Sequence, residues 1–202
     1  MGCSASGAVS TRNGHNQDMN GKSGPSKSQS RVIIKDDPRI PIAGRQVYLL
    51  KRSWKAIARN MDETGITMFM GLFEQNESVK NFFSTINKDV TLSELRESGL
   101  LESHVRGVML TIDEAMMSLD EPDFVIDMLT HVGKTHLRFN KFDPDIFWLI
   151  RDPFLMAVKE TLGDRYSAHM ADIYHKAISF ILTTLITGFK LGQKEKNMTT
   201  IQ

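Results

Sequence analysis

Apolar residues recur every three or four positions from Pro41 onward, which is the spacing of amphipathic helices. No stretch alternates apolar and polar residues for long enough to propose a sheet. The periods predict helices over residues 41–58, 62–73, 78–83, 91–119, 122–136, 144–163 and 166–191. This pattern, with no internal repeat, predicts an all-α fold of seven to eight helices.

Several helix ends carry local signals. Thr91 has Glu94 at the spacing of a capping box, and Pro122 suits the first turn of a helix. Pro153 lies inside the helix predicted over 144–163 and is expected to kink it. The last helix is expected to stop before Gly192, where the chain becomes polar.

The chain divides into three parts by composition. Its 202 residues suit one ordinary domain and a tail. Residues 1–40 are predicted to be a disordered tail, because Gly, Ser and Asn dominate its beginning and no apolar period is visible. Residues 41–192 form the helical domain, and 193–202 form a polar C-terminal tail. The positive surplus within 1–31 fits either a solvated spacer or a weak electrostatic aid to membrane attachment.

Composition excludes several classes of protein. A net charge of +1 gives no reason to expect a nucleic-acid partner. The single cysteine, Cys3, rules out an internal disulfide and a thiolate metal cluster. Without an apolar run of 18 residues or a secretory apolar core, the chain is expected to be intracellular and to lack a membrane span.

Two histidines are the main candidates for chemistry. His104 lies one helical turn before Val108, and His136 one turn after Val132, so each is predicted to face the core. A histidine on an apolar stripe is more often a structural residue bonded to a carbonyl than a metal ligand. Two of them on successive helices favour ligation, because imidazole suits iron. The Thr135 hydroxyl is expected to accept the second ring N–H of His136.

Other metal and catalytic sites fit the sequence less well. There is no His-Glu-x-x-His pattern, cysteine pair or carboxylate trio for zinc. A Ser-His-Asp hydrolase would need a strand–turn–helix around its nucleophile, and no strand is predicted. His131 is five residues before His136 and is expected to face solvent or the rim.

Several motifs of the sequence, in their order and spacing, resemble the globin family. The similarity runs through Ser53-Trp54, Phe73-Glu74-Gln75-Asn76, Phe82-Phe83, the segment 104–113 and the segment 129–136, and covers about 41–191. It looks most like the neuroglobin and globin X branch. The resemblance implies a globin fold around haem b, with His136 as proximal iron ligand. It implies that His104 is the distal ligand or a hydrogen-bond donor to bound dioxygen. The other cofactor-binding residues that it implies are Phe69, Phe83, Val108, Val132, Phe142 and Phe147.

The chain departs from the family pattern in three places. Glu77 replaces the proline usual at the start of the third helix. Gly107 replaces the basic residue often found three positions after the distal histidine, so the haem propionates need Arg106 or Arg138 instead. The cysteine pair of some neuroglobins is absent, so a disulfide-controlled ligand switch does not carry over.

The first residues match a pattern for lipid attachment. Met1-Gly2-Cys3, with Ser6, fits the pattern for myristoylation of Gly2, and Cys3 is the expected site of palmitoylation. A single myristoyl chain binds membranes marginally, with an association constant on the order of 10⁴ M⁻¹, so two chains are needed for stable residence. The match can also arise by chance. Acylation of Gly2 and Cys3 predicts a lipid anchor in the inner leaflet of the plasma membrane, on its cytoplasmic side.

These features predict a haem globin that binds dioxygen or another diatomic ligand reversibly. Membrane tethering favours redox signalling or electron transfer over bulk oxygen carriage. One alternative is a haem enzyme acting on nitric oxide or nitrite, which would need an external reductase because the chain has no space for a flavin domain. The other alternative is a haem-free helical adaptor at the membrane, in which both histidines are structural.

Overall fold

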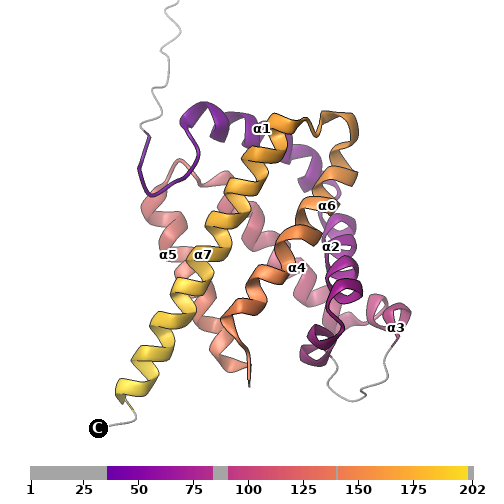
Figure 1. The fold of residues 1–202 in the computed structure, drawn as a ribbon, viewed down its shortest axis with the longest axis vertical. Coiled ribbons are helices and arrows are strands. Elements are labelled where there is room, and N and C mark those ends of the chain that lie inside the picture. Colours follow the sequence, from indigo (N-terminus) through magenta and orange to yellow (C-terminus); the bar gives the residue numbers. More distant parts are fainter. Residues whose placement is uncertain (1–35, 84–90, 140, 200–202) are drawn as a thin grey trace, which may run out of the picture. The chain divides into compact units, whose positions relative to one another are not determined.

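The computed structural model describes residues 36–83, 91–139 and 141–199, and every element within these ranges is helical (Figure 1). It contains α1 (Gly44–Arg59), α2 (Met61–Gln75), η1 (Glu77–Phe82), α3 (Leu92–Arg96), α4 (Gly99–Met117), α5 (Pro122–Thr135), η2 (His136–Arg138), η3 (Pro144–Ile150), α6 (Arg151–Leu162), η4 (Gly163–Arg165) and α7 (Ala168–Thr199), where η marks a 3₁₀ segment. The predicted all-α fold is confirmed.

The helix expected to run without a break from Thr91 is in fact two helices. Thr91 caps α3 as predicted: its hydroxyl accepts the Glu94 backbone N–H, and its own N–H donates to the Glu94 carboxylate at 2.8 Å. However, α3 ends at Arg96, and Ser98 takes an extended conformation that starts α4. Serine favours this position at a helix start, and the apolar period continues across it, so the sequence pattern concealed the break.

Pro153 does not kink a helix, contrary to the prediction. Residues Pro144–Ile150 form the 3₁₀ segment η3, and α6 begins only at Arg151. Pro153 therefore lies in the first turn of α6, where the missing backbone N–H would have no partner in the helix.

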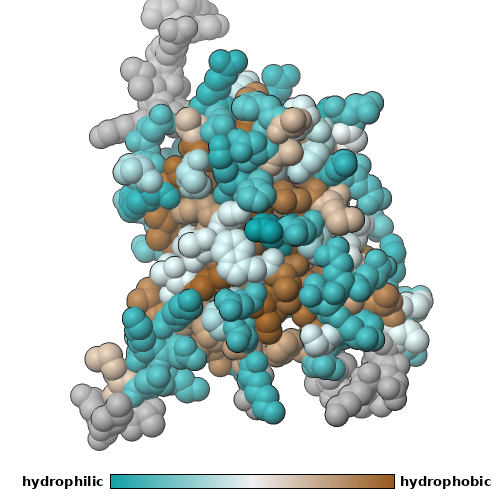
Figure 2. All heavy atoms as spheres, in the orientation of Figure 1, coloured by the Kyte–Doolittle hydropathy of each residue, from teal (hydrophilic) through white to brown (hydrophobic). Residues whose placement is uncertain are grey.

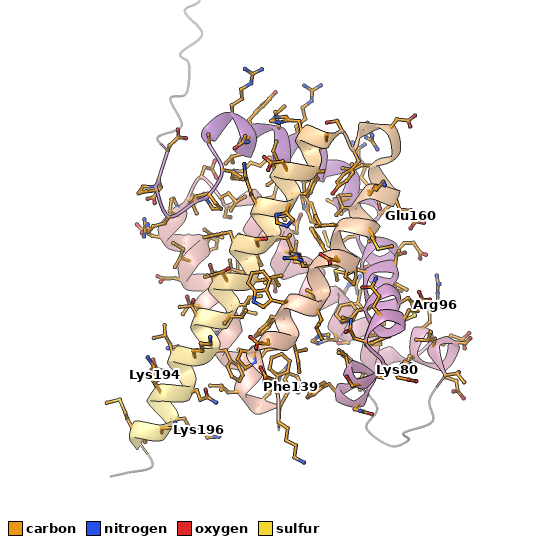
Figure 3. All side chains as sticks on the ribbon, viewed as in Figure 1. Lys80, Arg96, Phe139, Glu160, Lys194 and Lys196 are labelled. Carbon is orange, nitrogen blue, oxygen red and sulfur yellow. The ribbon has the colours of Figure 1, made fainter. Side chains whose placement is uncertain are left out.

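The last helix is longer than predicted. α7 continues past Gly192 to Thr199 and carries Lys194 and Lys196 on its final turns (Figure 3). This extension lies beside α5, where the Lys134 ammonium is 2.7 Å from the Glu195 carboxylate. A polar composition after Leu191 was therefore a poor guide to the end of this helix.

The core is built from the inward faces of α1, α2, α4, α5, α6 and α7. Trp54 is fully buried between Phe154 and Tyr174, with ring centroids 6.2 and 6.3 Å away, and its indole N–H donates to Asp113 at 2.6 Å. Polar side chains cover much of the face in Figure 2, and apolar ones show between them. None of the helices in the described ranges is long and apolar enough to cross a membrane.

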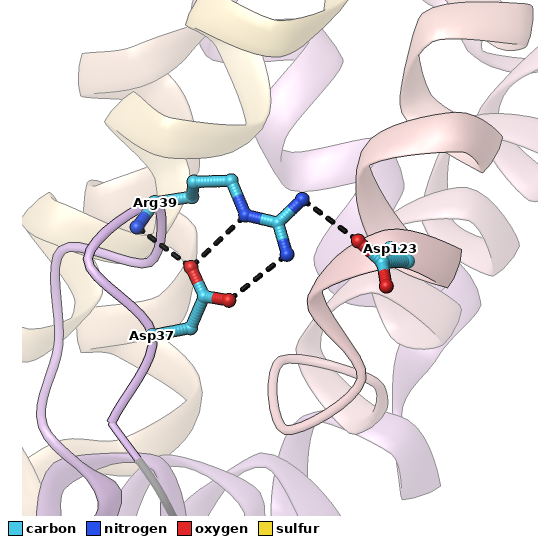
Figure 4. Close-up of polar contacts among 3 residues, drawn as sticks. All are labelled: Asp37, Arg39 and Asp123. Atoms are coloured by element: carbon cyan, nitrogen blue, oxygen red, sulfur yellow. Dashed lines mark hydrogen bonds and ion pairs between the residues drawn. The ribbon is translucent and has the colours of Figure 1, made fainter.

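The segment before α1 is attached to the start of α5. The Arg39 guanidinium donates twice to Asp37, at 2.9 and 3.0 Å, and lies 2.7 Å from Asp123 (Figure 4). Ile40 and Ile42 of the same segment are buried. Exposed ion pairs contribute little stability, so burial of the two isoleucines is the main contribution that holds this segment to the core.

Candidate functional site

One cavity of about 550 Å³ lies among α2, η1, α4, α5, η2, η3 and α7. Most side chains that line it are apolar, from phenylalanines of α2 and η3 to isoleucines and leucines of α7. A cavity of this size and character suits a flat, largely apolar ligand that meets only a few polar groups.

All eight residues that the sequence predicted to bind a cofactor line this cavity. They are Phe69, Phe83, His104, Val108, Val132, His136, Phe142 and Phe147. They come from α2, α4, α5, η2 and η3 and from the chain after η1 and η2, so residues as far apart as 69 and 147 are brought together. Their contact with a cofactor stays a prediction.

His104 occupies one wall of the cavity, on α4. Its ring meets Phe83 edge-on with a centroid distance of 5.0 Å, and Phe69 edge-on at 5.6 Å. Val108 lies one turn further along the same face and also lines the cavity. The imidazole is partly buried, and the described residues offer it no hydrogen-bond partner, so its ring nitrogens are available to a ligand in the cavity.

His136 belongs to a second aromatic cluster, at the junction of α5 and η2. Its ring lies 4.7 Å from Phe147 and 5.4 Å from Phe142, measured between centroids. Its Nδ1 is 3.0 Å from the carbonyl oxygen of Val132, one turn back in the helix. Since a carbonyl can only accept, Nδ1 carries the proton, and Nε2 keeps a free lone pair for a metal.

The partner predicted for His136 was wrong. The Thr135 hydroxyl does not accept the ring N–H; it donates to the Val132 carbonyl at 2.7 Å, the same oxygen that accepts from His136 Nδ1. A helical threonine commonly bonds back to a carbonyl in the preceding turn, which takes its hydroxyl away from the next residue. The hydrogen bond that fixes the tautomer of His136 is therefore made by a backbone carbonyl instead of a side chain.

Burial keeps both imidazoles neutral at physiological pH. It lowers the pKa of His104 to about 4, and repulsion from His136, once that ring is protonated in acid, and from Arg138 adds to the effect. The pKa of His136 is also lowered, mainly by burial, although its bond to the Val132 carbonyl opposes this. Two neutral imidazoles are the form that binds a metal.

The low pKa of His104 should make the haem-free protein less stable in acid. Below pH 6.5 His104 binds a proton in the unfolded chain, whereas in the folded protein it does so only near pH 4. The contribution of His104 to the free energy of unfolding is therefore present in full above pH 6.5, and the free energy of unfolding falls by about 3 kcal/mol as the pH drops to about 4. Urea unfolding of the haem-free protein across this range should show a shallower fall for His104→Leu than for the natural sequence. Parallel curves would contradict the pKa.

Arg138 is the one arginine or lysine among the described residues that line the cavity. Its guanidinium lies 4.8 Å above the ring of Phe139, the residue that directly follows η2. Arg106, the other arginine considered for the haem propionates, does not line the cavity and lies 4.0 Å from the Asp62 carboxylate. The structure therefore favours Arg138 as partner of an anionic group at the rim.

The donor set fits a haem better than a metal ion held by protein alone. The described residues contain no group of three or more histidine, cysteine or carboxylate side chains placed around one metal. Two neutral imidazoles in an apolar cavity match the needs of an iron whose other four ligands come from a macrocycle. His131, predicted to face outward, is exposed.

Sequence reasoning missed one wall of the cavity. Ile178, Ile181, Leu182 and Leu185 of α7 line it, and none of them was among the predicted site residues. Phe82 and Phe139 also line it. Nothing in a single sequence separates an apolar side chain that packs on protein from one that packs on a cofactor. The predicted acylation sites, Gly2 and Cys3, lie outside the described residues.

Comparison with known proteins gives one family. A model of the globin family matches residues 66–185. Cytoglobin-1 of Oryzias latipes is 30% identical over 155 residues, covering 77% of this chain and 85% of the relative. Neuroglobin of Tetraodon nigroviridis is 26% identical, covering 77% and 97%. A solved structure of a hexacoordinated heme protein from an anhydrobiotic tardigrade has 28% identity and a TM-score of 0.73, covering 77% and 99%.

Proposed function

The chain belongs to the globin family, and we propose that it is a redox-active haem globin whose iron is held by His136 on one side and His104 on the other. As a globin it binds haem, and through the haem iron it binds diatomic ligands such as dioxygen. The haem, when bound, supplies an iron that takes up such ligands and exchanges electrons. The finer assignments below, including haem b as the form bound, are proposals.

The observation that carries the proposal is the state of the two imidazoles. Both line the same cavity, and burial keeps both neutral. His136 Nδ1 is engaged with the Val132 carbonyl, so Nε2 is the free donor atom. The histidine of a metal site usually has its second nitrogen bonded in this way, which fixes the ring orientation and raises its basicity.

His104 is proposed as the ligand on the opposite side of the iron. Its ring packs edge-on against Phe69 and Phe83, and no described side chain or carbonyl forms a hydrogen bond with its nitrogens. The tardigrade protein, 28% identical, is described as hexacoordinated. An internal ligand competes with external diatomic ligands and lowers their apparent affinity. That arrangement suits electron transfer and redox signalling better than oxygen carriage.

The visible spectrum tests this proposal. In the reduced, ligand-free protein, two histidine ligands give sharp, split bands, whereas one histidine ligand gives a single broad band. Split bands that become broad in His104→Leu are the expected result. A purified protein without any haem absorbance after reconstitution would overturn the proposal in favour of a haem-free adaptor. Turnover of nitric oxide or nitrite with an external reductase would identify the enzyme alternative.

We also propose that Gly2 and Cys3 carry acyl chains that hold the protein at the cytoplasmic side of the plasma membrane. The pattern Met1-Gly2-Cys3 with Ser6 supports this. Membrane binding through one myristoyl chain is marginal, and the palmitoyl chain adds roughly 0.8 kcal/mol per buried methylene. Gly2→Ala should move the protein from the membrane fraction to the soluble fraction of cells. Gly7→Ala, in the same stretch but outside the pattern, should stay at the membrane. An unchanged distribution of Gly2→Ala would refute the anchor.

A further inference from the structure

α5 and α7 pack backbone against backbone, side by side in Figure 1. A Cβ atom on Gly188 would lie 2.2 Å from the Thr130 carbonyl oxygen and 2.7 Å from the Thr130 Cα. On the other helix, a Cβ on Gly133 would lie 2.1 Å from the Leu185 carbonyl oxygen. Only glycine fits at either position, because these neighbours are backbone atoms that cannot rotate away.

This contact lies directly behind the proximal histidine. Gly133 follows Val132, whose carbonyl accepts the His136 Nδ1 proton. The imidazole is therefore bonded to a stretch of helix that rests on the backbone of α7. On the α7 side, Leu185 provides the carbonyl that meets Gly133 and also lines the cavity. The position of His136 relative to the cavity thus depends on how closely the two helices approach.

The close packing of α7 continues past His136, against the residues that follow it. A Cβ on Gly192 would lie 2.7 Å from the Leu137 side chain, and the Lys134 ammonium lies 2.7 Å from Glu195. The last turns of α7, which the sequence did not predict, therefore hold the chain both before and after His136.

We propose that Gly133 and Gly188 are positioning residues for the iron ligand, and that their close contact sets where the His136 imidazole stands in the cavity. The inference rests on the proposed ligation of haem by His136. Ordinary contact begins near 3.4 Å, so a methyl group on Gly188 has to move α5 away from α7 by about 1 Å. That movement carries Val132 and the imidazole bonded to it.

The test compares Gly188→Ala with Gly71→Ala in the haem-loaded protein. Gly71 is also in a helix, but its Cβ would lie 3.7 Å from Pro153, an ordinary contact. Gly188→Ala should shift the iron–imidazole stretching band in resonance Raman spectra of the reduced His104→Leu background, where His136 is the sole histidine ligand. It should also speed transfer of haem to an acceptor protein about tenfold or more, as changes behind a metal ligand do. Gly71→Ala should change neither.

A second comparison separates positioning of His136 from general damage to the cavity. In a His104→Leu, His136→Gly protein supplied with free imidazole, the ligand is no longer attached to α5. Gly188→Ala should then leave the iron–imidazole band unchanged. A shift of the same size in that background would show that the glycine acts on the cavity as a whole, and would overturn the proposal.

The remaining outcomes are also decisive. If Gly188→Ala does not fold by circular dichroism, Gly192→Ala takes its place, because the atoms nearest to its methyl belong to the side chains of Leu137 and Lys134, which can shift. It should shift the band less but measurably. No shift in either folded variant overturns the inference while leaving haem ligation intact. If His136→Gly, without imidazole, keeps the natural band, the proposed ligation itself fails.

Discussion

Replacing His136 with alanine should remove most of the haem from the purified protein. The change takes away Nε2, the free donor of an imidazole that the Val132 carbonyl holds in one tautomer. Loss of a group that merely supports a ligand costs about 10- to 100-fold in metal affinity, so loss of the ligand itself should cost more than about 100-fold. The measurement is the Soret absorbance per protein after reconstitution with haem and gel filtration.

His131→Ala provides the matched control for that experiment. His131 lies in α5, five residues before His136, but it is exposed and does not line the cavity, so its removal should leave the Soret band at full height. Circular dichroism of both variants shows whether the helices are retained. Full haem content in His136→Ala would contradict its role as the main iron ligand.

Replacing His104 with leucine should open the iron to external ligands. Leucine keeps the cavity wall apolar beside Phe69 and Phe83 and removes the competing nitrogen. If the internal ligand occupies the iron most of the time, its removal should raise the apparent rate of carbon monoxide binding by about 10- to 100-fold. Flash photolysis or rapid mixing with the reduced protein measures this rate.

Haem retention distinguishes the two histidines. His104→Leu should keep its Soret band, because His136 remains. Glu102→Gln, an exposed neighbour on α4 outside the cavity lining, should bind carbon monoxide at the natural rate. A rate in His104→Leu equal to that of the natural sequence would mean that His104 does not occupy the iron. The ring would then serve only as a hydrogen-bond donor to the incoming ligand.

The helical period predicted the two histidines of the site well because it shows which side chains share one face of a helix. His104 with Val108, and Val132 with His136, share a face by spacing alone, and the structure places all four at one cavity. Phe69, Phe83, Phe142 and Phe147 were added by resemblance to the globin family, since composition could not distinguish them from ordinary core residues. They too line the cavity.

Two of the predictions that failed concern contacts between segments distant in sequence or competition for one acceptor. Thr135 was expected to accept from His136, but the Val132 carbonyl receives both groups. α7 was expected to end near Leu191, but Gly192 and Glu195 pack against residues of α5 and η2 and extend it. The period cannot report such tertiary contacts. The break between α3 and α4 was missed for a local reason, since leucines lie on both sides of Ser98 and their spacing does not show where α3 ends.

The Val132 carbonyl has an electronic consequence for the proposed iron site. It accepts from the Thr135 hydroxyl at 2.7 Å and from His136 Nδ1 at 3.0 Å, so its lone pairs are divided between two donors. A shared acceptor draws the Nδ1 proton less strongly than an undivided one, and the imidazole keeps less anionic character. If His136 holds the iron, a less electron-rich imidazole would stabilise ferrous over ferric iron. One threonine hydroxyl, outside direct reach of the metal, would thereby tune the midpoint potential upward.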